Sequence, residues 1–357
     1  MACINASIED GVQFMAGFRR RAIENRLPVN GAIAITHRCN LRCKMCYVNG
    51  GPDHRDLDTD FWLRTIDAIA DAGCLYLLFT GGEPLLRSDF NQLYKHARQR
   101  GILVTVFTNG TLLTESHLEL FREFPPLTVE VSLYGASPET YSAITGSGAA
   151  FEMTRANIIR LQESGCDVRL KTMLMQSTQA DLAAMEAFAA ELGLSFRFDP
   201  AIFSPLEGDS SPCDERVNAE DAARLEFEDP RRATEWKSFY DRFNKFMDPD
   251  KLFTCGAGIS TFHVDAAGSL QPCLAVDGVR YNLVDGSFPE GWQVISDMMA
   301  ELTMPEASPC RGCEARLVCG YCAATVSLET GRPDRPNPYS CELGMARLKQ
   351  IKTGPGE

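Results

Sequence analysis

Short apolar runs alternate with helical patterns along residues 31–200. Apolar runs of β type occur at 32–36, 75–80, 103–108, 127–133, 168–175 and 195–198. Between them, apolar residues recur at helical spacing near 59–72, 88–100, 114–123, 151–164 and 178–192. Apolar strands that are separated by helices are typical of a parallel sheet with helices packed outside it. The pattern predicts an α/β fold built from repeated β-α units.

The segments that flank this region have other patterns. Residues 1–30 show apolar positions at helical spacing, which predicts a helical lead-in. Residues 201–254 begin with a stretch rich in Pro, Ser, Gly and acidic residues and continue with helical patterns, and we interpret them as a bridge. Residues 255–345 are rich in cysteine and predict a small C-terminal domain, which leaves 346–357 as a tail.

Composition narrows the class of protein. A chain of 357 residues can hold one large α/β domain and a smaller one, and 45% hydrophobic with 23% charged residues is typical of a soluble globular protein. The net charge of −13 argues against nucleic acid as a partner. Neither a membrane-spanning run nor a secretory signal is evident. Fourteen cysteines in such a chain indicate metal ligands in a reducing, cytoplasmic compartment.

Three cysteines follow the first apolar run directly, in the sequence T-H-R-C-N-L-R-C-K-M-C-Y. Cys39, Cys43 and Cys46 have the spacing C-x3-C-x2-C. Three thiolates on one loop can hold three irons of a [4Fe–4S] cube and leave the fourth iron open to a small chelating molecule. Structural zinc is the alternative, but it usually takes four closed ligands from two paired spacings. The spacing favours the cluster over zinc and over unpaired thiols.

This loop resembles the signature of the radical S-adenosylmethionine (SAM) enzymes. The resemblance implies a partial (β/α)6 TIM-like barrel, with Cys39, Cys43 and Cys46 as catalytic ligands of the radical [4Fe–4S] cluster. In the family, SAM binds the open iron and is cleaved reductively to a 5′-deoxyadenosyl radical, which abstracts hydrogen from a substrate carbon. The family often has an aromatic residue before the third cysteine, where this chain has Met45. We expect Met45 to border SAM.

The second predicted strand ends in Gly81-Gly82-Glu83-Pro84. Two glycines let a backbone lie close to a ligand, and a carboxylate can accept hydrogen bonds from an ammonium group. The stretch resembles the GGEP motif, whose backbone and Glu hold the SAM amino group in the family. A tight turn without a binding role is the alternative.

Later strand ends supply further candidate SAM contacts. Asn109 follows the third strand and resembles part of a family loop that lines the SAM pocket, and Ser132 in the fourth strand resembles a family serine that contacts SAM. Several relatives place an arginine about twelve residues after that serine, where this chain has Ile144. Lys171 on the fifth strand could supply the missing charge to the SAM carboxylate, or could be a barrel lysine.

Cysteines return from residue 255 onward in an order that resembles the SPASM extension of radical SAM enzymes, which carries two auxiliary [4Fe–4S] clusters. The final gap of the family pattern C-x2-C-x5-C-x3-C is one residue shorter here. The resemblance assigns Cys255, Cys273 and Cys322 to the first auxiliary cluster. It assigns a full set to the second, namely Cys310, Cys313, Cys319 and Cys341.

The first auxiliary set lacks a fourth thiolate. An exchangeable site, a ligand other than cysteine, and Cys213 from the bridge are the alternatives. Zinc at the C-x2-C pair is the alternative for the whole domain. We interpret the other cysteines, Cys3, Cys74 and Cys166, as plain thiols.

The resemblance implies an oxidoreductase that most often acts on ribosomally made peptides, forming thioether or C–C links, epimerising or oxidising. A branch that makes formylglycine has an aspartate directly after the cysteine equivalent to Cys273, and Leu274 here argues against that branch. A small molecule or cofactor precursor is the alternative substrate. Expected partners are a reductase such as flavodoxin or ferredoxin and a separate leader-peptide-binding protein, since residues 1–30 are too few for such a domain.

Two alternatives belong to other classes of protein. A non-catalytic iron–sulfur electron carrier would have no use for the Gly81–Glu83 stretch beside an open-iron loop. A zinc-stabilised interaction protein would differ in its metal content.

Overall fold

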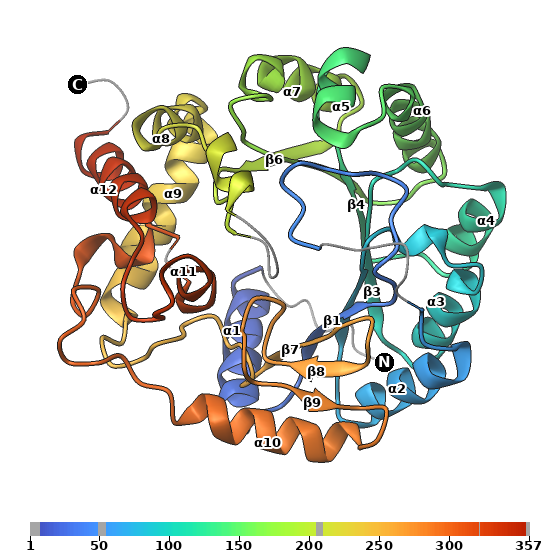
Figure 1. The fold of residues 1–357 in the computed structure, drawn as a ribbon, viewed down its shortest axis with the longest axis horizontal. Coiled ribbons are helices and arrows are strands. Elements are labelled where there is room, and N and C mark those ends of the chain that lie inside the picture. Colours follow the sequence, from blue (N-terminus) through green and yellow to red (C-terminus); the bar gives the residue numbers. More distant parts are fainter. Residues whose placement is uncertain (1–7, 49–54, 205–209, 321, 355–357) are drawn as a thin grey trace.

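A nine-stranded sheet forms the centre of the computed structural model, which describes residues 8–48, 55–204, 210–320 and 322–354. The strand order is β6-β5-β4-β3-β2-β1-β7-β8-β9 (Figure 1). Neighbouring strands from β1 to β6 are parallel, as predicted. These six strands are β1 (Asn30–Ala34), β2 (Tyr76–Thr80), β3 (Leu103–Thr108), β4 (Thr128–Ser132), β5 (Val168–Met173) and β6 (Ser195–Asp199).

Helices cover the outer face of this curved sheet (Figure 1). They are α2 (Thr59–Asp71), α3 (Phe90–Gln99), α4 (Glu115–Glu123), α5 (Pro138–Thr145), α6 (Ala149–Glu163) and α7 (Leu182–Glu191). The predicted α/β fold with a partial TIM-like barrel is therefore confirmed. Helix α5 was not predicted, although Ser137 caps it and Pro138 starts it, both of which are typical of a helix N-terminus.

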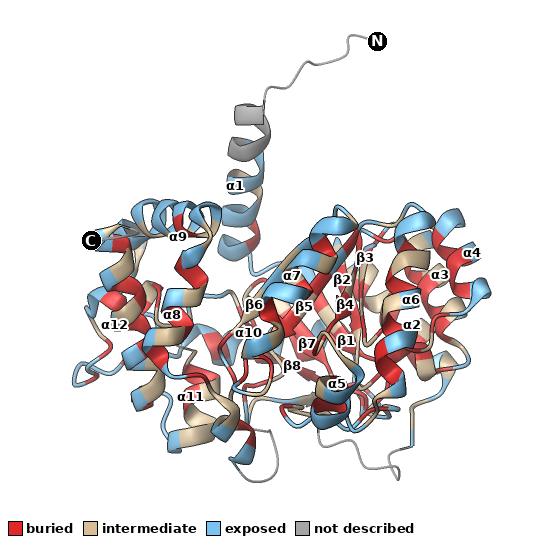
Figure 2. Cartoon of the chain, turned by 90° about the horizontal axis from the view of Figure 1, so that it is seen from above, coloured by how far each residue is buried: buried red, intermediate tan, exposed pale blue. Residues whose placement is uncertain are grey.

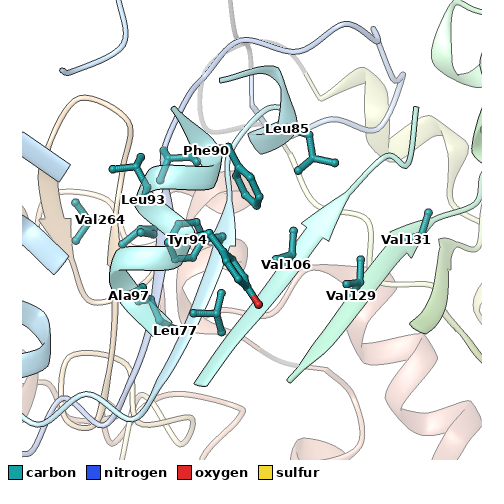
Figure 3. Close-up of a cluster of buried hydrophobic side chains, with 14 of the residues drawn as sticks. Leu77, Leu85, Phe90, Leu93, Tyr94, Ala97, Val106, Val129, Val131 and Val264 are labelled. Carbon is teal, nitrogen blue, oxygen red and sulfur yellow. The ribbon is translucent and has the colours of Figure 1, made fainter. Parts of the chain in front are cut away.

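Apolar side chains at helical spacing fix each helix against the sheet. On α3, four fully buried side chains at positions i, i+3, i+4 and i+7 face the strands: Phe90, Leu93, Tyr94 and Ala97. Figure 3 shows them packed over Leu77, Val106 and Val129 from β2, β3 and β4. Burial of one such side chain contributes about 1.5–3 kcal/mol, so this face anchors α3.

The sheet continues into the cysteine-rich region. β7 (Thr261–Val264) pairs in parallel with β1, and β8 (Ser269–Gln271) and β9 (Tyr281–Asn282) follow antiparallel. The junction depends on Gly31, because a Cβ there would lie 2.1 Å from the ring of Phe262. That ring packs on Phe288 and Trp292 of α10 (Phe288–Ala300). One continuous sheet therefore crosses the domain boundary predicted at 255.

A second group of helices packs beside the barrel (Figure 2). It contains α8 (Ala219–Glu228), α9 (Pro230–Phe243), α11 (Ala323–Thr330) and α12 (Pro338–Thr353). Helix α12 includes most of residues 346–357, the segment interpreted as a tail, and its Leu348 and Ile351 are buried against α8 and α9. Helix α1 (Ile8–Glu24) precedes the barrel. No helix in the described ranges is both long and apolar enough to span a membrane.

Candidate active site

The cysteine loop lies at the carboxyl ends of the parallel strands, where ligands of α/β proteins usually bind. Two neighbours hold its backbone. On one side the N–H of Gly82 donates to the Thr36 carbonyl at 2.7 Å, and on the other the N–H of Lys44 donates to the Ile144 carbonyl at 2.9 Å. The loop is therefore fixed between the end of β2 and the end of α5.

The thiols of Cys39, Cys43 and Cys46 line one cavity of ≈ 330 Å³. Burial raises the pKa of all three, that of Cys43 to about 12, and repulsion from the other two thiolates adds to the shift at Cys43. Ligation by iron would remove this penalty, since metal binding releases the thiol protons. The loop thus fits a group that binds several thiolates at once.

The arrangement of these thiols bears on which metal fits. Among the described residues, no three His, Cys, Asp or Glu side chains are arranged to hold a single metal ion. A [4Fe–4S] cube distributes its thiolates over separate irons. A loop with three thiolates fits a cube with one open iron better than structural zinc, which usually takes four closed ligands.

The two positions where the sequence departs from the resembled motif share one buried apolar cluster. Met45 and Ile144 belong to one buried apolar cluster, together with Met175 and Ile202. Ile144 is fully buried at the position where several relatives have an arginine. A flexible methionine and a branched aliphatic side chain fill this space under the loop. Met45 also lines the cavity, and its contact with SAM stays a prediction.

Gly81 and Gly82 line the cavity and lie close to the cysteine loop. A Cβ at Gly81 would lie 2.3 Å from the Thr36 carbonyl oxygen, and a Cβ at Gly82 would lie 2.3 Å from that of Arg38. Gly81 also has φ +145°, which other residues rarely adopt. The glycines therefore have a packing role as well as a position on the cavity wall.

Glu83 is fully buried behind this wall and is not among the residues that line the cavity. Its carboxylate accepts hydrogen bonds from the Leu85 N–H at 3.0 Å, the Thr108 hydroxyl at 2.8 Å and the Asn109 N–H at 2.7 Å. Burial raises its pKa to about 7, against the opposing effect of these donors. Glu83 thus ties the end of β2 to the end of β3, and its contact with SAM stays a prediction.

Asn109, Ser132 and Lys171 all line the cavity, on the ends of β3, β4 and β5. The Asn109 amide donates to Asn40 Oδ1 at 2.9 Å and lies 3.9 Å from Cys39 Sγ. The Lys171 ammonium lies 3.6 Å from Glu130 Oε2, so it already has an ionic partner. The structure therefore brings these predicted residues together around the thiols, and their SAM contacts stay predictions.

Sequence reasoning missed several residues of the cavity. Tyr47 and Phe203 stack at 5.9 Å between ring centroids and form an aromatic wall. Tyr134, Arg197 and Asp199 also line it. The alternation of β6 could have indicated Arg197 and Asp199, since residues two apart on a strand point to the same face.

The cysteines assigned to the first auxiliary cluster lie together. Burial raises the pKa of Cys255 and Cys273, and the nearby Cys322 raises both further. The shortened gap before Cys322 therefore does not separate it from the other two. The charges that affect the pKa of the Cys213 thiol come from Arg216, Glu329 and Asp214. Its Sγ lies 3.7 Å from the Ser204 hydroxyl.

The second auxiliary set also gathers at one place. Burial raises the pKa of Cys310, with Cys341 and Cys313 adding to the shift. Cys319 packs against α12, the helix that carries Cys341, so closely that a Cβ on Gly344 would lie 2.2 Å from its Cβ. Each thiol is thus influenced by cysteines of its own predicted set: Cys255 and Cys273 by Cys322, and Cys310 by Cys341 and Cys313. Cys74 and Cys166 lie outside both sets, and Cys3 lies outside the described residues.

Comparison with known proteins shows what the chain is similar to. Residues 33–188 match the model of the radical SAM superfamily. The AdoMet-dependent heme synthase of Nitratidesulfovibrio vulgaris is 24% identical over 85% of this chain and 90% of its own length. The mycofactocin maturase MftC of Mycolicibacterium smegmatis is 26% identical over 90% of this chain and 85% of its own length.

Solved structures share the fold. SuiB of Streptococcus suis bound to S-adenosylmethionine superposes with a TM-score of 0.69, at 17% identity, over 96% of this chain and 82% of its own. SuiB has also been solved with its precursor peptide SuiA. This likeness supports the fold of the chain as a whole.

Proposed function

We propose that this protein is a radical SAM enzyme that modifies a ribosomally made peptide. It would cleave SAM reductively and abstract hydrogen from a substrate carbon. The observation that carries the proposal is the single cavity that joins the thiols of Cys39, Cys43 and Cys46 to the candidate SAM contacts. Peptide-maturing relatives such as MftC, which this chain matches over most of their length, support the substrate class.

The residues have separate roles in this proposal. Thiolates of the three-cysteine loop would hold a [4Fe–4S] cluster, which when bound supplies the electron that converts SAM to a 5′-deoxyadenosyl radical. The backbone of Gly81 and Gly82 and the side chains of Asn109 and Ser132 would position SAM. The aromatic wall would exclude water from the reacting carbon.

The C-terminal cysteines would hold two auxiliary [4Fe–4S] clusters, able to pass an electron after hydrogen abstraction. A reductase such as flavodoxin or ferredoxin would supply the first electron. A leader-peptide-binding protein is a further proposed partner. Radical chemistry on a small molecule or cofactor precursor is the second candidate function, supported by the near full-length match to AdoMet-dependent heme synthases.

The first experiment tests the chemistry. Iron-reconstituted protein is incubated anaerobically with SAM and dithionite, and 5′-deoxyadenosine is quantified. The triple variant Cys39→Ala/Cys43→Ala/Cys46→Ala should lose one cluster and all SAM cleavage but retain the auxiliary iron. Cys166→Ala, a half-buried thiol away from the cavity, is the matched control. Formation of 5′-deoxyadenosine by the triple variant would overturn the proposal.

A second experiment tests the substrate class. The protein is co-expressed with a short peptide encoded beside its gene, and the peptide is analysed by mass spectrometry. A mass decrease that matches the loss of two hydrogen atoms indicates a cross-link or an oxidation. Active SAM cleavage with neighbouring peptides unchanged both in mass and in the chirality of their residues would favour the small-molecule alternative.

A further inference from the structure

Three charged side chains from adjacent strands form an ion-pair group, and two of them, Lys171 and Arg197, line the cavity. Glu130, Lys171 and Arg197 come from β4, β5 and β6, where Lys171 is in register with Arg197. Glu130 Oε2 lies 3.6 Å from Lys171 Nζ and 2.7 Å from Arg197 Nη2. Two cations therefore share one carboxylate, and the trio has one positive charge in excess when Lys171 is protonated.

The positive charges on the cavity wall contrast with the acidic character of the whole chain. The whole chain has a net charge of −13, yet both cations line the cavity. Asp199, the other charged lining residue, accepts a hydrogen bond from the Ala201 N–H at 2.8 Å. The face of Phe107 covers the Lys171 ammonium, which lies 2.9 Å from the ring centroid. The charged side chains that line this wall are two cations and one carboxylate, so cations outnumber carboxylates on the lining when Lys171 is protonated.

Arg197 has donors to spare for such a group. Its side chain is 54% exposed, and Glu130 uses its Nη2 group. A guanidinium has five N–H donors in a planar fork that matches a carboxylate. Lys171 is less exposed, at 19%, and burial lowers its pKa to about 7. A second carboxylate beside it would favour the protonated ammonium.

We propose that Arg197 and Lys171 together form a binding site for a carboxylate group inside the cavity. The source of that carboxylate rests on the proposed function. SAM carries one, and Ser132, a predicted SAM contact, is in register with Lys171. A peptide or small-acid substrate can also present one, and Arg197 lies one strand farther from Ser132.

The first arm of the test uses SAM and decarboxylated SAM, with affinity measured by equilibrium dialysis on the reconstituted protein without reductant. If the site holds the SAM carboxylate, wild type prefers SAM about ten- to hundredfold, and Arg197→Gln or Lys171→Met loses that preference. Arg197→Lys, which keeps the charge without the fork, should retain part of it. Arg169→Gln is the matched control, since Arg169 is 52% exposed on β5 and pairs with Asp167 outside the cavity.

The second arm tests the substrate as the source. N-acetylglycine, which has one carboxylate, and its neutral analogue N-acetylglycinamide are titrated into SAM-bound protein by calorimetry. If the site holds a substrate carboxylate, only the acid binds, and Arg197→Gln weakens it about tenfold or more. Its affinity in wild type should fall as the pH rises through 7, because Lys171, which faces Glu130, Arg197 and Phe107, then loses its proton.

Either pattern supports the site and identifies the source of the carboxylate. If Arg197→Gln and Lys171→Met, both folded by circular dichroism, match Arg169→Gln in both arms, the proposal is overturned. Neither arm needs SAM cleavage. A wild type that fails to make 5′-deoxyadenosine would refute the proposed function without deciding this inference.

Discussion

Replacing Glu83 with glutamine separates the structural role of this carboxylate from its predicted role in SAM binding. The substitution keeps the side-chain volume and removes the charge. Burial raises the pKa of Glu83 to about 7, so the carboxylate is ionised at pH 8 and protonated near pH 5. A carboxylate offers about four acceptor positions, and three are used by Leu85, Thr108 and Asn109. The predicted contact with the ammonium group of SAM would use the remaining position.

Two opposing effects set the expected stability. In the unfolded chain the carboxyl titrates near 4.5, and the rise to about 7 corresponds to roughly 3 kcal/mol of stability that is present below pH 4.5 and lost as the pH rises through 7. A glutamine side chain does not ionise, so the variant does not lose this stability as the pH rises. Its NH2 group, however, opposes the N–H of Asn109, and leaving that donor unpaired costs about 1–3 kcal/mol. The effects nearly offset each other at pH 8, whereas near pH 5 the variant should be less stable by about 1–3 kcal/mol.

Urea unfolding followed by circular dichroism at pH 8 and pH 5 measures this difference, with exposed Glu123→Gln as the control. Equilibrium dialysis at pH 8 measures SAM binding, which should weaken roughly ten- to hundredfold with iron content unchanged. A stability difference that is equal at both pH values would refute the reasoning about ionisation. Unchanged SAM affinity would assign Glu83 to the turn alone.

Two further predictions concern the C-terminal half. Arg347→Met should lower the free energy of unfolding, measured in urea, by about 3–5 kcal/mol, because it leaves Glu226 buried without its two 2.7 Å hydrogen bonds. The double variant Glu226→Leu/Arg347→Met should recover most of that loss. An Arg347→Met variant within about 1 kcal/mol of wild type would contradict this. Cys213→Ala should leave about twelve irons per reconstituted chain, the content of three cubes, whereas a fall towards eight would show that Cys213 closes the first auxiliary set.

Local patterns in the sequence determined the barrel and its first ligand loop. Strand and helix periods depend on neighbours a few residues away, so β3 was predicted at its observed bounds, Leu103–Thr108. The three-cysteine loop was placed correctly after β1 for the same reason. The predicted first strand nevertheless ran to Thr36, two residues beyond the observed end at Ala34.

Only the tertiary structure decided which distant side chains meet. Residue spacing could not show that Ile144 and Met45 belong to one buried cluster, or that Lys171 shares Glu130 with Arg197. It could not show either that the region after 346 is a packed helix. These contacts join residues far apart in the sequence, and their energies come from burial and charge pairing that exist once the strands are in register.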